Sequence, residues 1–550
     1  FHIGVKTSPR GVRKINIPLI VRCFLILLLL EMPFFVLPTA NYAAELQGEG
    51  TPRFEIRSYR VEGNSLLTQG AIDKILTPYT GKDSDFGTVQ EALEALEQAY
   101  HRRGYTAIQV FLPEQALERG EVMFRVMEAR MGAVKVEGNR YFSQGNIRKS
   151  LPALREGVPP NIDRISTNLR TANENPAKKV NLQMQGGEKE NEVNAVLKVT
   201  DERPWKIAFM GDNSGTRQTG KARTGVLVQH ANVADLDHLF TAMYTTSPDH
   251  IKEVSIYGAS YHIPIYAWSD SIDLFGGYSD VDSGTLPMGT ANLAVSGKGT
   301  VAGGRYNQTL TRLGRYEHKL IYGVDFRDYQ NNVNLAGIPL DTSVRVTPLS
   351  LSYGGSMQFT GAETGFNVGL FRNIPVCTGG KEADFSQVRT NAPADYTIFR
   401  YGGNLGYVLP QDWQFRLVFN GQYTDSALIP GEQFGLGGAT SVRGFDEREV
   451  ANDRGIFGSA ELYTPNLTQW LSLPKSLCRL LAFYDIGQVS GVNVQPGDEG
   501  RMTLTSAGVG IRLDIMKILT MALDYGYVLN PGLTGDRGNS RFHIRAVLTF

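Results

Sequence analysis

At 550 residues the chain is longer than one ordinary compact core, which indicates several folded units. Lys plus Arg and Asp plus Glu both number 55, and this zero net charge speaks against nucleic acid as a partner, because nucleic-acid binders carry a basic excess. The abundance of glycine (60), tyrosine (24) and phenylalanine (26) favours turns and strands over helices.

The N-terminal segment has the pattern of an export signal. Basic residues precede an apolar run of eight at 23–30, and small residues follow at Ala40, Ala43 and Ala44. A membrane-spanning helix needs about 20 apolar residues, so the pattern predicts a signal peptide over residues 1–44 rather than a transmembrane anchor. We therefore expect an exported protein, either soluble beyond the inner membrane or a barrel in an outer membrane.

Residues 53–202 contain an internal repeat. The letters V-E-G-N at 61–64 return at 136–139, and each copy continues with a Thr or Ser helix cap and a short helix. A longer helix and two strands follow in each copy, which predicts two β-α-α-β-β modules at 53–130 and 131–202, each with an open sheet edge.

From Arg203 to Phe550 the sequence pattern changes: segments of about ten residues alternate apolar residues with polar or small ones. In the last segment Phe542, Ile544, Leu548 and Phe550 lie on one face, and basic side chains and a histidine lie on the other. This is the two-residue period of a transmembrane β-barrel, although a soluble sandwich also alternates. The exported context and a count of about sixteen segments favour an antiparallel barrel over residues 203–550.

No catalytic, metal or nucleotide site is apparent in the sequence. The segment 215–222 approaches a phosphate-binding loop, but Ala222 replaces the hydroxyl residue and a strand pattern follows where a helix is required. The histidines have no zinc-site spacing, and no nucleophile lies beside a base. We expect neither an enzyme nor a cofactor, and Cys377 and Cys478 are too far apart for a CxxC site, although they could still form one bridge.

The segment GLGGATSVRGFDE at 435–447 lies in a long connection, residues 425–452, between the eleventh and twelfth predicted strands. Long loops in ordered proteins are usually functional or disordered. One interpretation is a flexible surface loop with a solvated Arg443. The other places the loop in the lumen with Arg443 paired to Asp485, because alternation in 480–489 points Phe483 and Asp485 inward.

The combination of these motifs resembles a known family. The two modules look like POTRA domains, and S-V-R-G-F at 441–445 looks like the motif of the BamA-type outer-membrane superfamily. Further pieces narrow the resemblance to the TpsB transporters of two-partner secretion, of hemolysin and filamentous-hemagglutinin type. These pieces are R-G-Y at 103–105, L-P-E-Q at 112–115, N-E-N-P at 173–176, D-N-S-G at 212–215, T-G-K-A-R at 219–223 and E-Q-F-G-L-G-G at 432–438.

The resemblance implies two periplasmic POTRA domains before a sixteen-stranded barrel with an inward-folded loop. It also implies a lock between the motif Val442, Arg443, Gly444 and Phe445 and the barrel-wall residues Phe483 and Asp485. The expected partners are a secreted TpsA-like exoprotein, outer-membrane lipid and the barrel-assembly machinery, which would insert the chain through its terminal strand, with no nucleic acid and no nucleotide. Family members often begin with a plug helix and a linker, but only a few residues separate Ala44 from Phe54, so either the plug is absent or something else closes the pore, with the loop itself as the expected candidate.

These expectations lead to a hypothesis for transport. An unfolded partner would add as a strand to an open POTRA edge, thread the lumen and fold outside, and its folding would supply direction. The main alternative is an assembly factor of the BamA or TamA type that inserts other barrels, but such proteins usually carry more than two POTRA domains. A passive porin leaves the repeated modules unexplained.

Overall fold

The computed structural model describes most of the chain after residue 52. The predicted signal peptide at 1–44 lies outside the described residues. Those residues are 53–115, 120–189, 191–215, 219–280, 284–288, 291–295, 298–335, 338–469, 475–494, 500–532 and 537–550.

The first module follows the predicted order and adds two short strands. Its three-stranded sheet has the order β2-β5-β4, with β2 parallel to β5 and β4 antiparallel to it, and β1 pairs separately with β3. The elements are β1 (Phe54–Ile56), β2 (Ser58–Glu62), α2 (Gln69–Leu76), β3 (Gly81–Ser84), α3 (Phe86–His101), β4 (Ile108–Phe111) and β5 (Glu121–Glu128).

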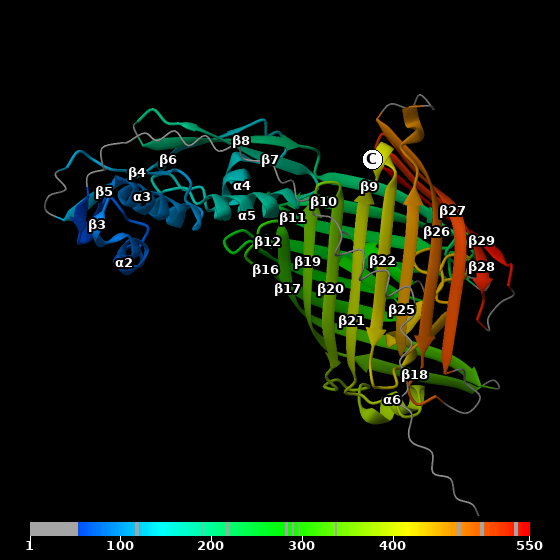
Figure 1. The fold of residues 1–550 in the computed structure, drawn as a ribbon. Helices are drawn as coiled ribbons and strands as arrows, with labels where there is room; N and C mark the ends of the chain where they lie inside the picture. Colours follow the sequence, from blue (N-terminus) through cyan, green and yellow to red (C-terminus); the bar gives the residue numbers. More distant parts are fainter. Residues whose placement is uncertain are drawn as a thin grey trace, which may run out of the picture.

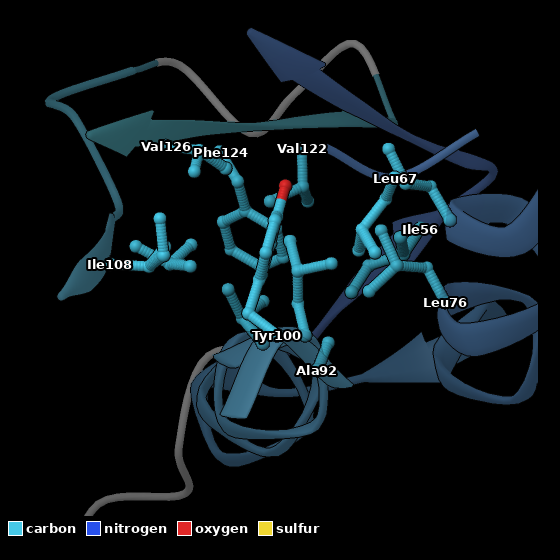
Figure 2. Close-up of a cluster of buried hydrophobic side chains, with 13 residues drawn as sticks. Ile56, Leu67, Leu76, Ala92, Tyr100, Ile108, Val122, Phe124 and Val126 are labelled. Atoms are coloured by element: carbon cyan, nitrogen blue, oxygen red, sulfur yellow. The ribbon is translucent and has the colours of Figure 1, made fainter. Parts of the chain in front are cut away.

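The core of this module lies between α3 and the sheet. Asp85 caps the N-terminus of helix α3, because its side chain accepts a hydrogen bond from the Thr88 amide. The buried residues of the helix recur with a helical period. Figure 2 shows Tyr100 rising from this helix toward Phe124 on β5. Both side chains are fully buried, and the Tyr100 hydroxyl donates to Asn64 at 2.7 Å.

The repeated V-E-G-N letters form the same turn in both modules. Gly63 and Gly138 have φ angles of 80° and 85°, and a Cβ on them would lie 2.3 and 2.5 Å from a carbonyl oxygen of the neighbouring strand. Only glycine tolerates both constraints. Asn64 and Asn139 each donate their side-chain amide at 2.8 Å to the carbonyl three residues on, which fixes the turn.

The second module repeats the arrangement of the first. Its sheet order is β6-β8-β7, with β6 parallel to β8, and both helices follow the repeated turn. The elements are β6 (Arg130–Glu137), α4 (Gln144–Lys149), α5 (Ile162–Asn173), β7 (Lys178–Gly186) and β8 (Glu192–Asp201).

The rest of the described chain forms a closed antiparallel barrel (Figure 1). Strands β18 and β19 are two halves of one strand interrupted at Thr347, so the wall has sixteen strands, as the alternation predicted. Its segments are β9 (Trp205–Asp212), β10 (Arg223–Val233), β11 (His238–Thr246), β12 (Ile256–Ile265), β13 (Asp270–Ser279), β16 (Lys298–Thr309), β17 (Tyr316–Leu335), β18 (Ile338–Val346), β19 (Pro348–Phe359), β20 (Ala362–Asn373), β21 (Thr397–Val408), β22 (Gln414–Tyr423), β25 (Arg454–Tyr463), β26 (Ser476–Ser490), β27 (Arg501–Ile515), β28 (Leu519–Asn530) and β29 (Ser540–Thr549).

Large apolar side chains cover the outside of the barrel. Phe209, Leu370 and Tyr484 are each about half exposed, while their sequence neighbours face the lumen. Among the described residues no helix is long and apolar enough to cross a membrane.

The barrel closes between its first and last strands. Five residue pairs join β9 to β29, from Asp212 with Arg545 to Ala208 with Thr549. The terminal Phe550 adds two backbone hydrogen bonds to Ile207, of 2.8 and 3.1 Å, so the last residue of the chain is part of the seam. The segment 215–222 joins the antiparallel neighbours β9 and β10, which excludes the helix start that a phosphate-binding loop requires.

Some elements go beyond the predictions. A hairpin of β14 (Gly284–Met288) and β15 (Ala291–Val295) lies between β13 and β16, and β17 is longer than its predicted segment because it also pairs with β18. The helix α6 (Glu382–Val388) lies in a region where we expected no helix. Seven residues are too few to reveal a helical period, although its Phe385 is fully buried.

The second module is docked on the barrel turns between β10 and β11 and between β12 and β13. Lys178 forms a fully buried ion pair with Asp237, and the Tyr266 hydroxyl donates to the same carboxylate at 2.6 Å. Burial lowers the pKa of Lys178, and Asp237 opposes that shift. Asn175 of the N-E-N-P segment donates to the Ala231 carbonyl at 2.6 Å. Figure 1 shows both modules at the barrel end that carries the C-terminus, opposite α6.

Candidate functional site: the loop inside the barrel

The connection between β22 and β25 folds back along the inner wall of the barrel. Two short strands within it, β23 (Phe434–Leu436) and β24 (Val450–Asn452), pair with each other. Between them Val442 and Phe445 are buried against wall residues that include Val489 and Val528. The sequence left a solvated surface loop open as an alternative, and this packing excludes it.

Arg443 lies at the centre of this packing and is 4% exposed. Its Nε and Nη2 atoms donate to the two carboxylate oxygens of Asp485 at 2.7 and 2.8 Å, and its backbone amide donates to the same carboxylate at 3.1 Å. Nη1 donates to Glu461 at 2.8 Å, and Nη2 also donates to Ser459 at 3.0 Å. The guanidinium stacks on Phe483, with Cζ 3.5 Å from the ring centre.

The wall residues owe their positions to the two-residue period of β26. Phe483 and Asp485 are 5% and 0% exposed, whereas Tyr484 and Ile486 between and beside them are 46% and 44% exposed on the outer face. The structure thus brings Arg443 onto the two residues that alternation placed inside. A planar guanidinium bound through two parallel hydrogen bonds is held in one orientation, which a lysine would not reproduce.

Glycine permits the loop backbone to touch the wall. Gly444 has a φ of 97°, and its amide donates to His543 Nε2 at 2.9 Å. Directly beneath it, a Cβ on Gly526 would lie 2.5 Å from the Gly444 nitrogen, so β28 presents bare backbone at the point of contact.

Several contributors were not assigned by the sequence analysis. Glu461 and Ser459 face inward from β25 and bond Arg443 directly, and Asp524 lies 3.6 Å from its Nη1. Asp524 and His543 are buried on the inner faces of their strands, and the two-residue period of a strand names no partner for either.

The residues predicted for the terminal strand face outward. Phe542, Ile544, Leu548 and Phe550 are 53%, 44%, 36% and 68% exposed. The two cysteines, whose pairing the sequence left open, are free thiols at Cys377 and Cys478.

Known proteins share both the sequence pattern and the fold. Residues 192–513 match the family of haemolysin secretion/activation proteins ShlB/FhaC/HecB, and residues 54–129 match the ShlB-type POTRA domain. The outer membrane transporter CdiB of Escherichia coli is 24% identical over 87% of this chain and 79% of its own length. The heme/hemopexin transporter protein HuxB of Haemophilus influenzae is 21% identical over 86% of this chain and 84% of its own length.

A solved structure of CdiB from Escherichia coli superimposes with a TM-score of 0.75, covers 93% of each chain and is 21% identical. At 21% identity this structural similarity is evidence of a shared fold and of nothing further. The family match spans more than half of the chain and includes the pore-loop motif, Arg443 and Asp485. The chain therefore belongs to the haemolysin secretion/activation protein family ShlB/FhaC/HecB.

Proposed function

We propose that this chain is an outer-membrane transporter of two-partner secretion, which captures an unfolded exported partner protein in the periplasm and passes it through its barrel to the cell surface. Residues 53–130 and 131–202 act as the periplasmic capture modules, and residues 203–550 form the conduit. The observation that carries this proposal is a loop that occupies the lumen through polar contacts centred on Arg443.

A wide barrel filled by a loop is suited to gated passage. The loop's centre is held by hydrogen bonds and an ion pair, which water can replace once the loop withdraws. We assign Val442, Arg443, Gly444 and Phe445 as the mobile part of the gate, and Phe483 and Asp485 as its seat on the wall.

The modules supply open sheet edges at the periplasmic mouth. In the sheet orders, β2 and β4 are the outer strands of the first module, and β6 and β7 are those of the second. An extended chain can add to such an edge through backbone hydrogen bonds, which requires little sequence identity in the partner. The partner is then an unfolded TpsA-like exoprotein.

The outward aromatic and aliphatic residues of β29 contact lipid. We assign Phe542, Ile544, Leu548 and Phe550 to insertion of the chain by the barrel-assembly machinery, because the terminal strand must be recognised before the seam with β9 can close.

The test is secretion of a candidate exoprotein, sought in the reading frame beside that of this chain and co-expressed with it in a Gram-negative host that lacks both proteins. We expect the exoprotein outside the cell only when the chain is present, and loss of export with Arg443→Ala at an unchanged level of folded barrel. A charge-reversed pair, Arg443→Asp with Asp485→Arg, should recover part of the export.

The same strains separate transport from barrel assembly. If depletion of the chain lowers other outer-membrane barrels and leaves the exoprotein outside the cell, the chain is an assembly factor and the proposal is wrong.

A further inference from the structure

Glu432 lies where the loop leaves the barrel wall, eleven positions before Arg443 in the sequence. It is 2% exposed, although it belongs to a connection between two strands. A buried carboxylate is costly unless it is paired and hydrogen-bonded. Its partners therefore reveal what holds this end of the loop.

Those partners come from strands on the other side of β22 from the strands that bind Arg443. Arg327 on β17 donates to Glu432 Oε1 at 2.6 Å, and the Tyr329 hydroxyl donates to the same oxygen at 2.8 Å. Arg400 on β21 donates to Oε2 at 3.4 Å. Both carboxylate oxygens are thus bonded to the wall.

The backbone around Glu432 is fixed as well. The single proton of the Tyr329 hydroxyl is shared with the Gly431 carbonyl, 3.1 Å away, and Gln422 on β22 donates to the Glu432 carbonyl at 3.0 Å. Gln422 further donates to the Asp453 carbonyl at 3.0 Å, so one side chain joins the start and the end of the connection.

The two cationic partners are also held by other residues of the wall, and Arg400 donates from Nε to Gln422 on β22 at 2.9 Å. Arg327 also donates to Asp325 at 2.7 Å, and Asp325 forms a second ion pair with Arg305 on β16. These contacts lie within the wall and do not involve the loop. The wall therefore presents Arg327 and Arg400 as a preformed seat for one carboxylate, in the way that Asp485 is a seat for one guanidinium.

We propose that Glu432 is a second anchor of the pore loop, which holds its root to β17 and β21 while Arg443 holds its centre to β25 and β26. The two anchors hold different parts of the loop to different strands of the wall, so full withdrawal requires both to break. Glu432 is a positioning residue for the gate, and this inference rests on the proposed function of the barrel as a conduit.

Two independent anchors make a quantitative prediction for the purified full chain in planar lipid bilayers. Glu432→Gln keeps the shape of the side chain and removes its charge, and we expect the open fraction of the pore to rise at least about tenfold. Arg443→Ala should raise it independently. In the double variant the two fold-changes should multiply, because withdrawal from both seats is required.

The matched control is Asp273→Asn. Asp273 on β13 is another carboxylate in the barrel wall, bonded to His262 and Asn307 of the neighbouring strands at 2.7 Å each. Its variant should conduct like the wild type. Folding of each variant is checked by the heat-dependent shift of the barrel in gel electrophoresis.

The result that overturns the proposal is an open fraction for Glu432→Gln equal to that of Asp273→Asn, with the double variant equal to Arg443→Ala. If Glu432→Gln does not fold, Tyr329→Phe is tested against the same control in its place, because it removes one hydrogen bond to Glu432 without changing the charge. The failure of the proposed function would look different: the exoprotein would stay inside cells that carry the wild-type chain, whatever the variants conduct.

Discussion

Replacing Gly526 by alanine adds one methyl group to β28 at the point where the loop contacts it, and so tests whether the loop lies there. The new Cβ would lie 2.5 Å from the Gly444 nitrogen and 2.8 Å from the Arg443 carbonyl carbon, both atoms of the loop backbone. Contacts below 3.0 Å are essentially never tolerated, and ordinary contact begins near 3.4 Å. The loop must therefore move away from β28 by about 1 Å, since the strand is held on both sides by its ladders.

A shift of this size disrupts specific hydrogen bonds. The bond from the Gly444 amide to His543, 2.9 Å long, would stretch to about 3.9 Å, which is beyond hydrogen-bonding distance. Adding a methylene-sized group to a packed site costs about 1–3 kcal/mol. About 2 kcal/mol on the seated state raises the ratio of withdrawn to seated loop about thirtyfold, because each 1.4 kcal/mol corresponds to a factor of ten.

The assay is single-channel recording of the purified chain, with Gly458→Ala as the matched control. Gly458 lies on β25 of the same barrel, and its added Cβ would meet no atom nearer than 3.9 Å, on the outward-facing Ile486. We expect frequent large openings with Gly526→Ala and wild-type behaviour with Gly458→Ala. Identical traces from the two variants would refute the seating of the loop on β28.

Three further predictions address the lock, the repeated turn and the docking of the second module. Asp485→Asn should open the pore more than Ser459→Ala in bilayer recordings, because removing one partner of a buried ion pair costs about 3–5 kcal/mol, whereas losing the hydrogen bonds of a hydroxyl to charged groups costs about 1.5–3 kcal/mol. Gly138→Ala should lower the melting temperature of the periplasmic region while the barrel keeps its heat-dependent gel shift, because φ there is 85° and the Cβ would lie 2.5 Å from a carbonyl oxygen. Lys178→Met should speed limited proteolysis between module and barrel, because it leaves the carboxylate of Asp237 buried without its cation.

Features with a local period were predictable from the sequence. Alternation along 480–489 placed Asp485 inside because the side chains of any strand alternate between its faces, whatever the strand packs against. The recurrence of V-E-G-N predicted two modules, because the same turn requires glycine at the same position in each of them. The sixteen strands followed from counting these periods.

Contacts across the lumen were beyond local reasoning. Glu432 has no periodic neighbours, and its partners Arg327 and Arg400 precede it by 105 and 32 positions. Arg443 could be given one partner because Asp485 lies on an inward face. Glu461 lies on such a face too, but the periodicity of a strand does not say which inward groups share one cation. Which inward-facing carboxylates reach the same cation depends on how the barrel curves and closes.

In the proposed gate, the chemistry of the two anchors would let the loop both seal the pore and leave it. Buried ion pairs contribute little net stability, because their desolvation offsets their attraction. When the loop withdraws, Arg443 and Asp485 both regain water, so this part of opening costs little. The apolar contacts oppose withdrawal: Leu436 and Val442 are fully buried, and each would cost about 1.5–3 kcal/mol to expose. The apolar side chains therefore favour the closed state, while the polar anchors set where the loop lies. A seat built from apolar residues alone would hold the loop without fixing its position, and it would leave an adhesive surface in the path of an unfolded chain.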